Sequence, residues 1–206
     1  MNDGTAAERE RWAKRYTTPG YLFGTEPNAF LKSQAHLLRK GQTALAIADG
    51  EGRNGVFLAE QGLDVLSLDF SDVAQDKARA LAKQRGVSMR LAQADMTQWV
   101  WTPETFNVVV GIFIQFATPP QRAAMFAGIK QTLKPGGLLL LQGYGLKQLD
   151  YKTGGPSEPE RLYTRKLLEE CFADFSSLEI QEHDSVIKEG DHHVGMSALV
   201  DLVGRK

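Results

Sequence analysis

With 24 basic against 25 acidic side chains in 206 residues, the chain has a formal charge of −1 and lacks the basic excess of most nucleic-acid-binding proteins. Its length suits one domain, residues 1–206, and its longest apolar run (138–141) is far too short to cross a membrane. The first residues are too polar for a signal peptide, and the single cysteine, Cys171, lies in a helix pattern that favours a packed thiol. We therefore expect a cytoplasmic protein, monomeric or homodimeric, with no nucleic-acid or membrane partner.

Residues 1–40 are expected to form a helical cover in front of the sheet. A helix over 8–16 should end at the Pro19-Gly20 pair, and a second helix should begin near Pro27, since proline is favoured in a first turn. Four aromatic side chains of this cover have two open interpretations, a lid over a ligand or ordinary core packing: Trp12, Tyr16, Tyr21 and Phe23.

Strand and helix patterns alternate through the middle of the chain. Strands are predicted at 44–48, 64–68, 87–91, 106–114 and 138–142, and helices at 53–61, 71–86 and 120–133. The run 106–114 is almost entirely apolar, as expected of a strand covered on both faces. A turn is expected at 134–137. This alternation predicts a parallel sheet with right-handed crossovers.

The end of the chain departs from that alternation. A polar insertion at 145–160, which contains glycine and proline, precedes a helix near 164–172 and two strands, 178–187 and 194–203. The connection between those strands is so short that they must pair antiparallel. Both faces of the last strand carry apolar residues, so we expect it to lie inside the sheet.

The sequence Asp49-Gly50-Glu51-Gly52-Arg53-Asn54-Gly55 follows the first strand and opens a helix. Glycines allow a close backbone approach, and the free N–H groups of a helix start attract polar or anionic groups. The spacing matches the dinucleotide-binding fingerprint, and Asp69 ends the next strand. Three features oppose a dinucleotide: Glu51, which would repel a pyrophosphate, a second acid at Asp95, and the terminal hairpin.

Several motifs together resemble the class I S-adenosylmethionine (SAM)-dependent methyltransferases. They are Asp49-Gly50-Glu51-Gly52, Asp69, Ala94-Asp95-Met96, residues 106–115 and Leu133-Lys134-Pro135-Gly136-Gly137. The pattern Gly-Glu-Gly-Arg-Asn, the preceding segment 21–28 and Thr153-Gly154-Gly155-Pro156 resemble the small tellurite-resistance (TehB-like) and thiopurine-methyltransferase-like branch. The resemblance implies an α/β fold, a three-layer Rossmann-like methyltransferase sandwich. Its mostly parallel seven-stranded sheet would have the order 3-2-1-4-5-7-6, with the last strand antiparallel.

The resemblance also implies a site for SAM, whose product is S-adenosylhomocysteine. Asp69 would accept hydrogen bonds from both ribose hydroxyls. Asp95, or the backbone beside it, would bind the adenine amino group. The cofactor-binding residues that the resemblance implies are Asp49, Gly50, Glu51, Gly52, Arg53, Asn54, Asp69, Phe70, Ala94, Asp95, Met96, Gly111 and Ile112. Each acid also has a structural interpretation, because Asp is common after strands and at helix caps.

One departure from the family concerns the first strand. The usual acid and glycine are replaced by Ala46 and Ala48, and Asp49 stands where a small residue is frequent. We expect either that Asp49 supplies the missing carboxylate or that backbone carbonyls hold the SAM ammonium.

The order and direction of the strands indicate which residues would contact the methyl acceptor. Ligands bind at the carboxyl ends of parallel strands, and an antiparallel last strand begins at that same edge. Gln115, Tyr144 and His193 are therefore the candidate catalytic residues, although the His192-His193 pair is also typical of a solvated turn. No metal-ligand spacing stands out. We predict in-line methyl transfer to a small-molecule acceptor, namely a thiol, a thiopurine or a chalcogen oxyanion. An NAD-type oxidoreductase and a non-catalytic SAM-binding module stay open as alternatives.

Overall fold

The computed structural model describes residues 3–190 and 193–206, with the side chains of residues 3–9 excepted. Its centre is a seven-stranded sheet of order β3-β2-β1-β4-β5-β7-β6, which confirms the predicted order. Strands β1 to β5 run parallel, and β7 is antiparallel to both β5 and β6, as expected. The strands are β1 (Thr43–Ile47), β2 (Asp64–Asp69), β3 (Arg90–Gln93), β4 (Phe106–Ile112), β5 (Leu133–Tyr144), β6 (Ser177–Glu189) and β7 (His193–Arg205).

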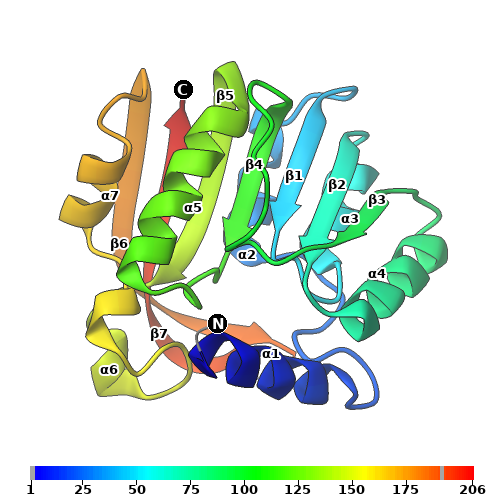
Figure 1. Ribbon diagram of the computed structural model, residues 1–206, viewed down its shortest axis with the longest axis horizontal. Helices are drawn as coiled ribbons and strands as arrows, with labels where there is room; N and C mark the ends of the chain where they lie inside the picture. The colour runs from blue at the N-terminus through cyan, green and yellow to red at the C-terminus, as the bar shows by residue number, and fades with distance from the viewer. Residues whose placement is uncertain (1–2, 191–192) are drawn as a thin grey trace.

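Helices cover both faces of this sheet. The helices of the described chain are α1 (Asp3–Tyr16), α2 (Ala29–Ser33), α3 (Arg53–Glu60), α4 (Asp72–Gln84), α5 (Pro119–Thr132), α6 (Gln148–Tyr151) and α7 (Arg165–Cys171), with 3₁₀ turns at Ala35–Leu37 and Pro159–Arg161. Helices α2 and α3 pack on one face, and α5 and α7 pack on the other (Figure 1). Across the described part of the chain, every helix is too short or too polar to span a bilayer.

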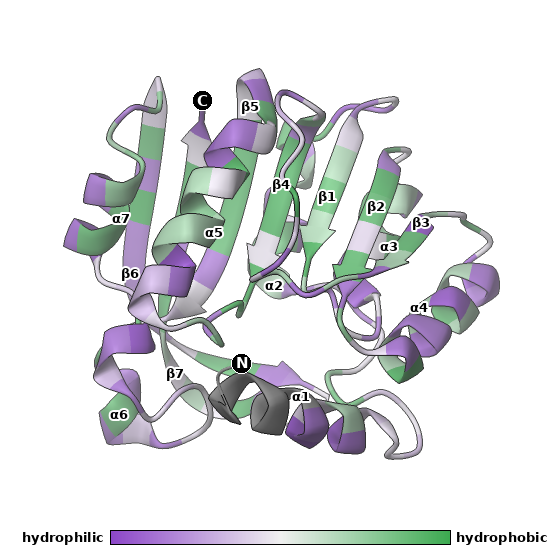
Figure 2. Cartoon of the chain, in the orientation of Figure 1, coloured by the Kyte–Doolittle hydropathy of each residue, from purple (hydrophilic) through white to green (hydrophobic). Residues whose placement is uncertain are grey.

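The core is divided by the sheet, because successive strand residues point to opposite faces. In β1, Leu45 and Ile47 join the cluster under α5 and α7, whereas Ala44 and Ala46 join the cluster under α2 and α3. Figure 2 shows the resulting pattern, with hydrophobic strands at the centre and hydrophilic residues on the outer helices. Ala46 is only 1% exposed. The position of the usual first-strand acid therefore belongs to the apolar core of this protein.

Several element boundaries differ from the sequence predictions. Strand β1 ends at Ile47 and β4 at Ile112, because the next residues, Ala48 (φ 46°) and Phe113 (φ 55°), adopt left-handed backbone conformations that extended strands exclude. Strand β3 begins at Arg90 rather than at 87. The turn expected at 134–137 is a bulge inside β5, where the pairing jumps from Phe106–Leu133 to Val108–Leu138.

The predicted second helix is broken into two pieces. Asn28 caps α2, since its side chain accepts a hydrogen bond from the Leu31 N–H. The helix then ends at Ser33, and a 3₁₀ turn follows over Ala35–Leu37. The segment that leads into α2 therefore forms an irregular loop between α1 and the sheet.

The carboxyl edge of the parallel strands is covered by three segments that lie far apart in the sequence. Figure 1 shows α1, the α6 region and the far end of the β6–β7 hairpin beyond the arrowheads of β1 and β4. The hairpin pairs continuously from Ser177–Arg205 to Glu189–His193. Its pairing with β5 ends at Tyr144–Leu199, so the rest of the hairpin extends past the sheet. This overhang brings residues near 190 to residues 49–55, the glycine loop.

Candidate active site

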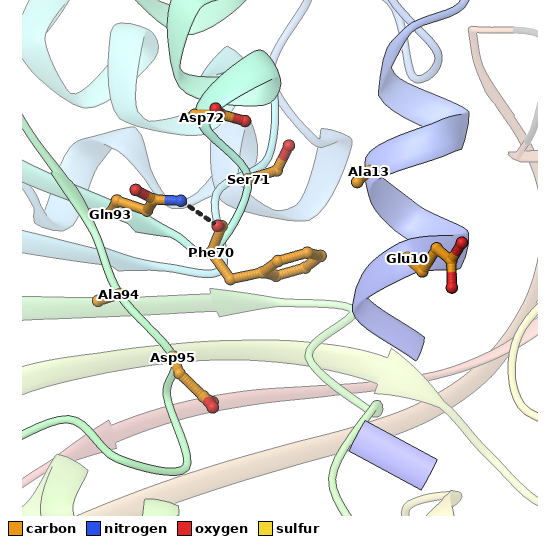
Figure 3. Close-up of a pocket in the computed structure, with 8 residues that line it drawn as sticks. All are labelled: Glu10, Ala13, Phe70, Ser71, Asp72, Gln93, Ala94 and Asp95. Atoms are coloured by element: carbon orange, nitrogen blue, oxygen red, sulfur yellow. Dashed lines mark hydrogen bonds between the residues drawn. The ribbon is translucent and has the colours of Figure 1, made fainter. Parts of the chain in front are cut away.

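A cavity of about 550 Å³ lies between these three covering segments and the carboxyl ends of the strands. Its lining comes from the glycine loop, the ends of β2, β3 and β4, helix α1, the insertion at 154–158 and the start of β7. A second hollow of about 480 Å³ adjoins it and shares Phe70, Ala94 and Asp95. Figure 3 shows this hollow, with the Phe70 ring extending from the end of β2 toward α1. Gln93 closes one side by donating a hydrogen bond to the Phe70 carbonyl (2.9 Å).

The glycine loop makes a tight turn at the floor of the cavity. Gly50 (φ 58°) donates its N–H to Asp69 Oδ2 at 2.8 Å. A Cβ at Gly50 would lie 2.8 Å from the Tyr16 hydroxyl, so α1 rests directly on the loop there. A Cβ at Gly52 would lie 2.5 Å from the Cβ of Ala78, so Gly52 permits α3 and α4 to pack closely. The two glycines therefore serve different purposes.

Most of the predicted cofactor residues line the cavity: Asp49, Gly50, Arg53, Asn54, Asp69, Phe70, Ala94, Asp95, Met96 and Ile112. Glu51, Gly52 and Gly111 do not appear in its lining. Glu51 instead accepts hydrogen bonds from the Leu22 N–H (2.7 Å) and from Lys77 Nζ (2.7 Å), which fastens the N-terminal cover to the loop. Gly111 faces the core, where a Cβ would lie 2.8 Å from Ile114 Cδ1.

Asp69 is held in position by the backbone. Its Oδ2 accepts from the Gly50 N–H, and its Oδ1 accepts from the Ser71 N–H at 2.9 Å. Burial raises the pKa of Asp69 to about 6, against the lowering effect of these N–H groups. An ionised carboxylate offers about four lone-pair sites. The backbone N–H groups of Gly50, Ser71 and Phe70 use up to three of them, so Asp69 keeps acceptor capacity toward the cavity.

Asp49 lies beneath the first turn of α3. Ser67 donates its hydroxyl to Asp49 Oδ2 at 2.7 Å, and the Gly55 N–H lies 3.2 Å from both carboxylate oxygens. Burial raises the pKa of Asp49 to about 7, although these hydrogen bonds act in the opposite direction. Asp49 is thus a cavity-lining carboxyl that a bound cation would help to ionise.

A buried network joins the loop to the overhanging hairpin. Arg53 pairs with Glu189 Oε2 at 2.6 Å, and both side chains are about nine-tenths buried. Asn28 Nδ2 donates to Glu189 Oε1 (2.9 Å) and to Gln142 Oε1 (2.7 Å). Burial alone would raise the pKa of Glu189, but His193 and Arg53 lower it to about 2. The network therefore holds an ionised carboxylate beside His193.

His193 lies where the topology predicted, at the carboxyl edge and in the cavity lining. Its Nδ1 is 3.5 Å from Glu189 Oε2 and makes no hydrogen bond to a described residue. Burial lowers the pKa of His193, with Glu189 opposing that shift, so the imidazole is neutral at neutral pH. A carboxylate beside Nδ1 favours the tautomer protonated there, which leaves the Nε2 lone pair available. His192 lies outside the described residues.

Tyr144 and Gln115 also line the cavity but differ in what their polar atoms contact. The buried Tyr144 hydroxyl has no hydrogen-bond partner among the described residues. Burial raises the pKa of Tyr144 well above its usual range, so the phenol stays neutral. Gln115 instead donates to the carbonyls of Tyr144 and Arg161 and accepts from the Tyr144 N–H (2.6 Å). Its amide positions the ends of β4 and β5.

Three of the four cover aromatics, Trp12, Tyr16 and Phe23, line the cavity. Tyr21 packs beside Val56, and its hydroxyl donates to the Lys77 carbonyl (3.1 Å).

Sequence reasoning missed several residues of this site, of which Arg15 and Glu189 matter most. Glu189 lies in a polar turn that resembles many solvated turns. Phe113 was predicted inside the fourth strand, and nothing in the sequence indicates its left-handed backbone conformation. Arg15 lies in the last turn of a helix, where basic residues are common, so its position gave no sign of a ligand site.

Comparison with known proteins agrees with this geometry. The model of the family described as "Methyltransferase domain" matches residues 44–137, from β1 through the β5 bulge. Residues 44–137 form a methyltransferase domain. Its cofactor is S-adenosylmethionine. The glycine loop, Asp69 and Asp95 all belong to this methyltransferase domain, whereas α1, the insertion and the hairpin lie outside it.

Relatives of the methyltransferase domain align over part of the chain. An uncharacterized methyltransferase of Bacillus subtilis, YbaJ, is 29% identical over 106 residues, which are 49% of this chain and 40% of that protein. The chain spans less than half the length of the curated relatives it matches.

Solved structures extend the similarity over almost the whole chain. One comes from work on the conversion of a disulfide bond into a thioacetal group during echinomycin biosynthesis (TM-score 0.75, 18% identity, 98% of this chain and 92% of that one). Another is TehB from Haemophilus influenzae (TM-score 0.71, 17% identity, 96% of this chain and 66% of that one). These likenesses show the three-layer Rossmann-like fold.

Proposed function

We propose that this protein transfers a methyl group from SAM to a small organic acceptor bound in the 550 Å³ cavity. We also place it in the TehB-like and thiopurine-methyltransferase-like branch, which the motifs around the glycine loop and the structural likeness to TehB support. One observation carries the proposal: the same cavity is lined by Asp49 of the glycine loop and Asp69 at the end of β2, and also by Tyr144 and His193. A cofactor and an acceptor would therefore meet inside one enclosed space.

The residues around the cavity fit SAM. When bound, SAM supplies a methyl group on a positively charged sulfonium. Asp69, with its remaining lone pairs, would hold the ribose hydroxyls. Asp49 would face the ammonium group, in place of the missing first-strand acid. The hollow beside Phe70 and Asp95 would accommodate the adenine ring (Figure 3).

On the acceptor side, His193 is a candidate general base. A thiol or hydroxyl acceptor must lose its proton as the new bond forms, and the Nε2 lone pair of a neutral imidazole can take it. Glu189 then stabilises the resulting imidazolium through Nδ1. The neutral Tyr144 hydroxyl is buried without a partner among the described residues, so an acceptor that reached it would receive a hydrogen bond. Holding the reacting atoms in line and excluding water supply most of the rate enhancement.

The experiment compares ligands and then acceptors. SAM and S-adenosylhomocysteine should raise the melting temperature of the purified protein, and NAD should not. A screen with labelled SAM over thiols, thiopurines, selenite, tellurite and phenols should then detect transfer of the label. Stabilisation by NAD alone would refute the proposal in favour of an oxidoreductase. Binding of SAM without transfer to any acceptor would favour a non-catalytic binding module.

A further inference from the structure

Arg15 presents a cation to the cavity. It lies in the last turn of α1, is half-buried and lines the cavity. Its guanidinium carbon lies 4.4 Å from the centre of the Trp12 ring and 6.0 Å from that of Phe23. Within the described part of the chain, no carboxylate lies within ion-pair distance of it. Two aromatic faces thus fix the guanidinium in place without neutralising it.

Two other cavity-lining arginines, Arg53 and Arg161, have acidic or carbonyl partners. Arg53 pairs with Glu189. Arg161 lies 3.5 Å from Glu158 and donates to the Phe116 carbonyl. Burying a charge costs free energy unless it is paired. A ligand that fills the cavity would displace water from Arg15 and so bury its charge further. A ligand with a negative charge is therefore favoured there.

An aromatic wall leads from Arg15 to the candidate catalytic groups. The rings of Phe23 and His193 lie 4.3 Å apart, those of His193 and Phe113 4.8 Å, and those of Phe113 and Tyr144 4.7 Å. All four rings line the cavity. A ligand that reaches from Arg15 to Tyr144 must therefore lie along a continuous, mostly apolar surface. Burial of apolar area against such a surface favours a carbon-rich ligand.

We propose that the acceptor is a small organic acid, whose carboxylate binds Arg15 and whose apolar body lies along the wall of Phe23, His193, Phe113 and Tyr144. This inference rests on the proposed function and specifies its substrate class. A carboxylate matches Arg15 in charge and can bind a guanidinium in two parallel hydrogen bonds. An inorganic chalcogen oxyanion could not use the apolar wall. A dianion would be repelled more strongly than a monoanion by Asp49 and Asp69, which line the same cavity.

The test measures equilibrium binding to the protein saturated with S-adenosylhomocysteine. The probes are hydroxy- and mercapto-substituted benzoates and phenylpropanoates, each paired with its uncharged methyl ester. We expect at least one acid to bind about tenfold or more tightly than its ester, as is typical of a hydrogen bond between charged groups. Arg15→Gln should remove that preference and leave ester binding unchanged. The matched control is Lys14→Gln, which alters an exposed basic residue of the same helix outside the cavity and should keep the preference.

The outcomes separate this inference from the proposed function. Equal binding of acids and esters, failure of every acid to bind, or an acid preference that survives in Arg15→Gln would overturn the inference while the SAM site stands. Tellurite that competes for the site where no acid does would overturn it as well. Failure of S-adenosylhomocysteine itself to bind would overturn both. Arg15→Lys keeps the charge without the planar fork, so it should retain part of the preference.

Discussion

Replacing Asp49 by Asn tests whether this carboxylate substitutes for the acid that the first strand lacks. The amide is isosteric, and its oxygen and nitrogen can still bond to the Gly55 N–H and the Ser67 hydroxyl, so the fold should be kept. Loss of a charged hydrogen bond to the SAM ammonium should cost about 1.5–3 kcal/mol, or roughly 10- to 150-fold in Kd. Isothermal titration with SAM and with methylthioadenosine, which lacks the amino-acid part, measures this directly.

The pH dependence of binding gives a second readout of the same substitution. A carboxyl with a pKa of about 7 is about half ionised at pH 7 and about one-tenth ionised at pH 6. If only the ionised form holds the ammonium, the affinity of the parent protein for SAM should fall about fivefold between pH 7 and pH 6. The Asp49→Asn protein should show no such dependence.

The pH dependence of stability has the opposite sign in the ligand-free protein. Unfolded Asp49 ionises near pH 3.9, whereas folded Asp49 keeps its proton up to about pH 7. The folded state therefore binds more protons in this window, and stability falls as the pH rises through it. Asp49→Asn removes that contribution, so the ligand-free variant should melt above the parent at pH 8.

Two results would refute the assignment of Asp49 to the ammonium. One is a SAM affinity within about twofold of the parent. The other is an equal loss of affinity for methylthioadenosine, which would indicate a general distortion of the loop. Glu51→Gln is the matched control, because Glu51 is a carboxylate of the same loop that does not line the cavity and bonds instead to Leu22 and Lys77.

Three further substitutions test other parts of the structure. Ala48→Gly should raise the free energy of unfolding by about 1 kcal/mol, because Ala48 has φ 46° and glycine adopts that conformation without strain. Thermal melting measures this gain, and a melting temperature below that of the parent would contradict the prediction. Asp69→Asn should weaken SAM and methylthioadenosine alike, in contrast to Asp49→Asn, and unchanged affinity for both would remove Asp69 from the ribose site. Glu189→Gln should lower the free energy of unfolding in urea by about 3 kcal/mol, because it leaves the Arg53 charge buried without its counter-ion. A decrease below about 0.5 kcal/mol would show that the ion pair is dispensable for stability.

Much of the fold could be predicted from the sequence because its signals are local. Hydrophobic periodicity located the strands, and the short final connection required an antiparallel hairpin. The glycine spacing located the loop, and Asp69 followed from its position at the end of β2. The order of the strands in the sheet was predicted from the family resemblance, and the structure confirms it. Two of the misplaced boundaries, the ends of β1 at Ile47 and of β4 at Ile112, arose where a non-glycine residue adopts a left-handed conformation.

The tertiary structure decided which side chains of the glycine loop face the cavity. Glu51 and Asp49 are two residues apart in one acidic loop. Glu51 accepts a hydrogen bond from Leu22 of the N-terminal segment, whereas Asp49 lines the cavity. Nothing in the sequence brings Glu189 to Arg53, since that contact depends on how far the β6–β7 hairpin extends past β5. The same holds for Arg15, whose exposure to the cavity depends on how α1 lies across the strand ends. Backbone periodicity is a local property that a sequence records, whereas the direction and burial of a polar side chain are set by partners distant in the chain.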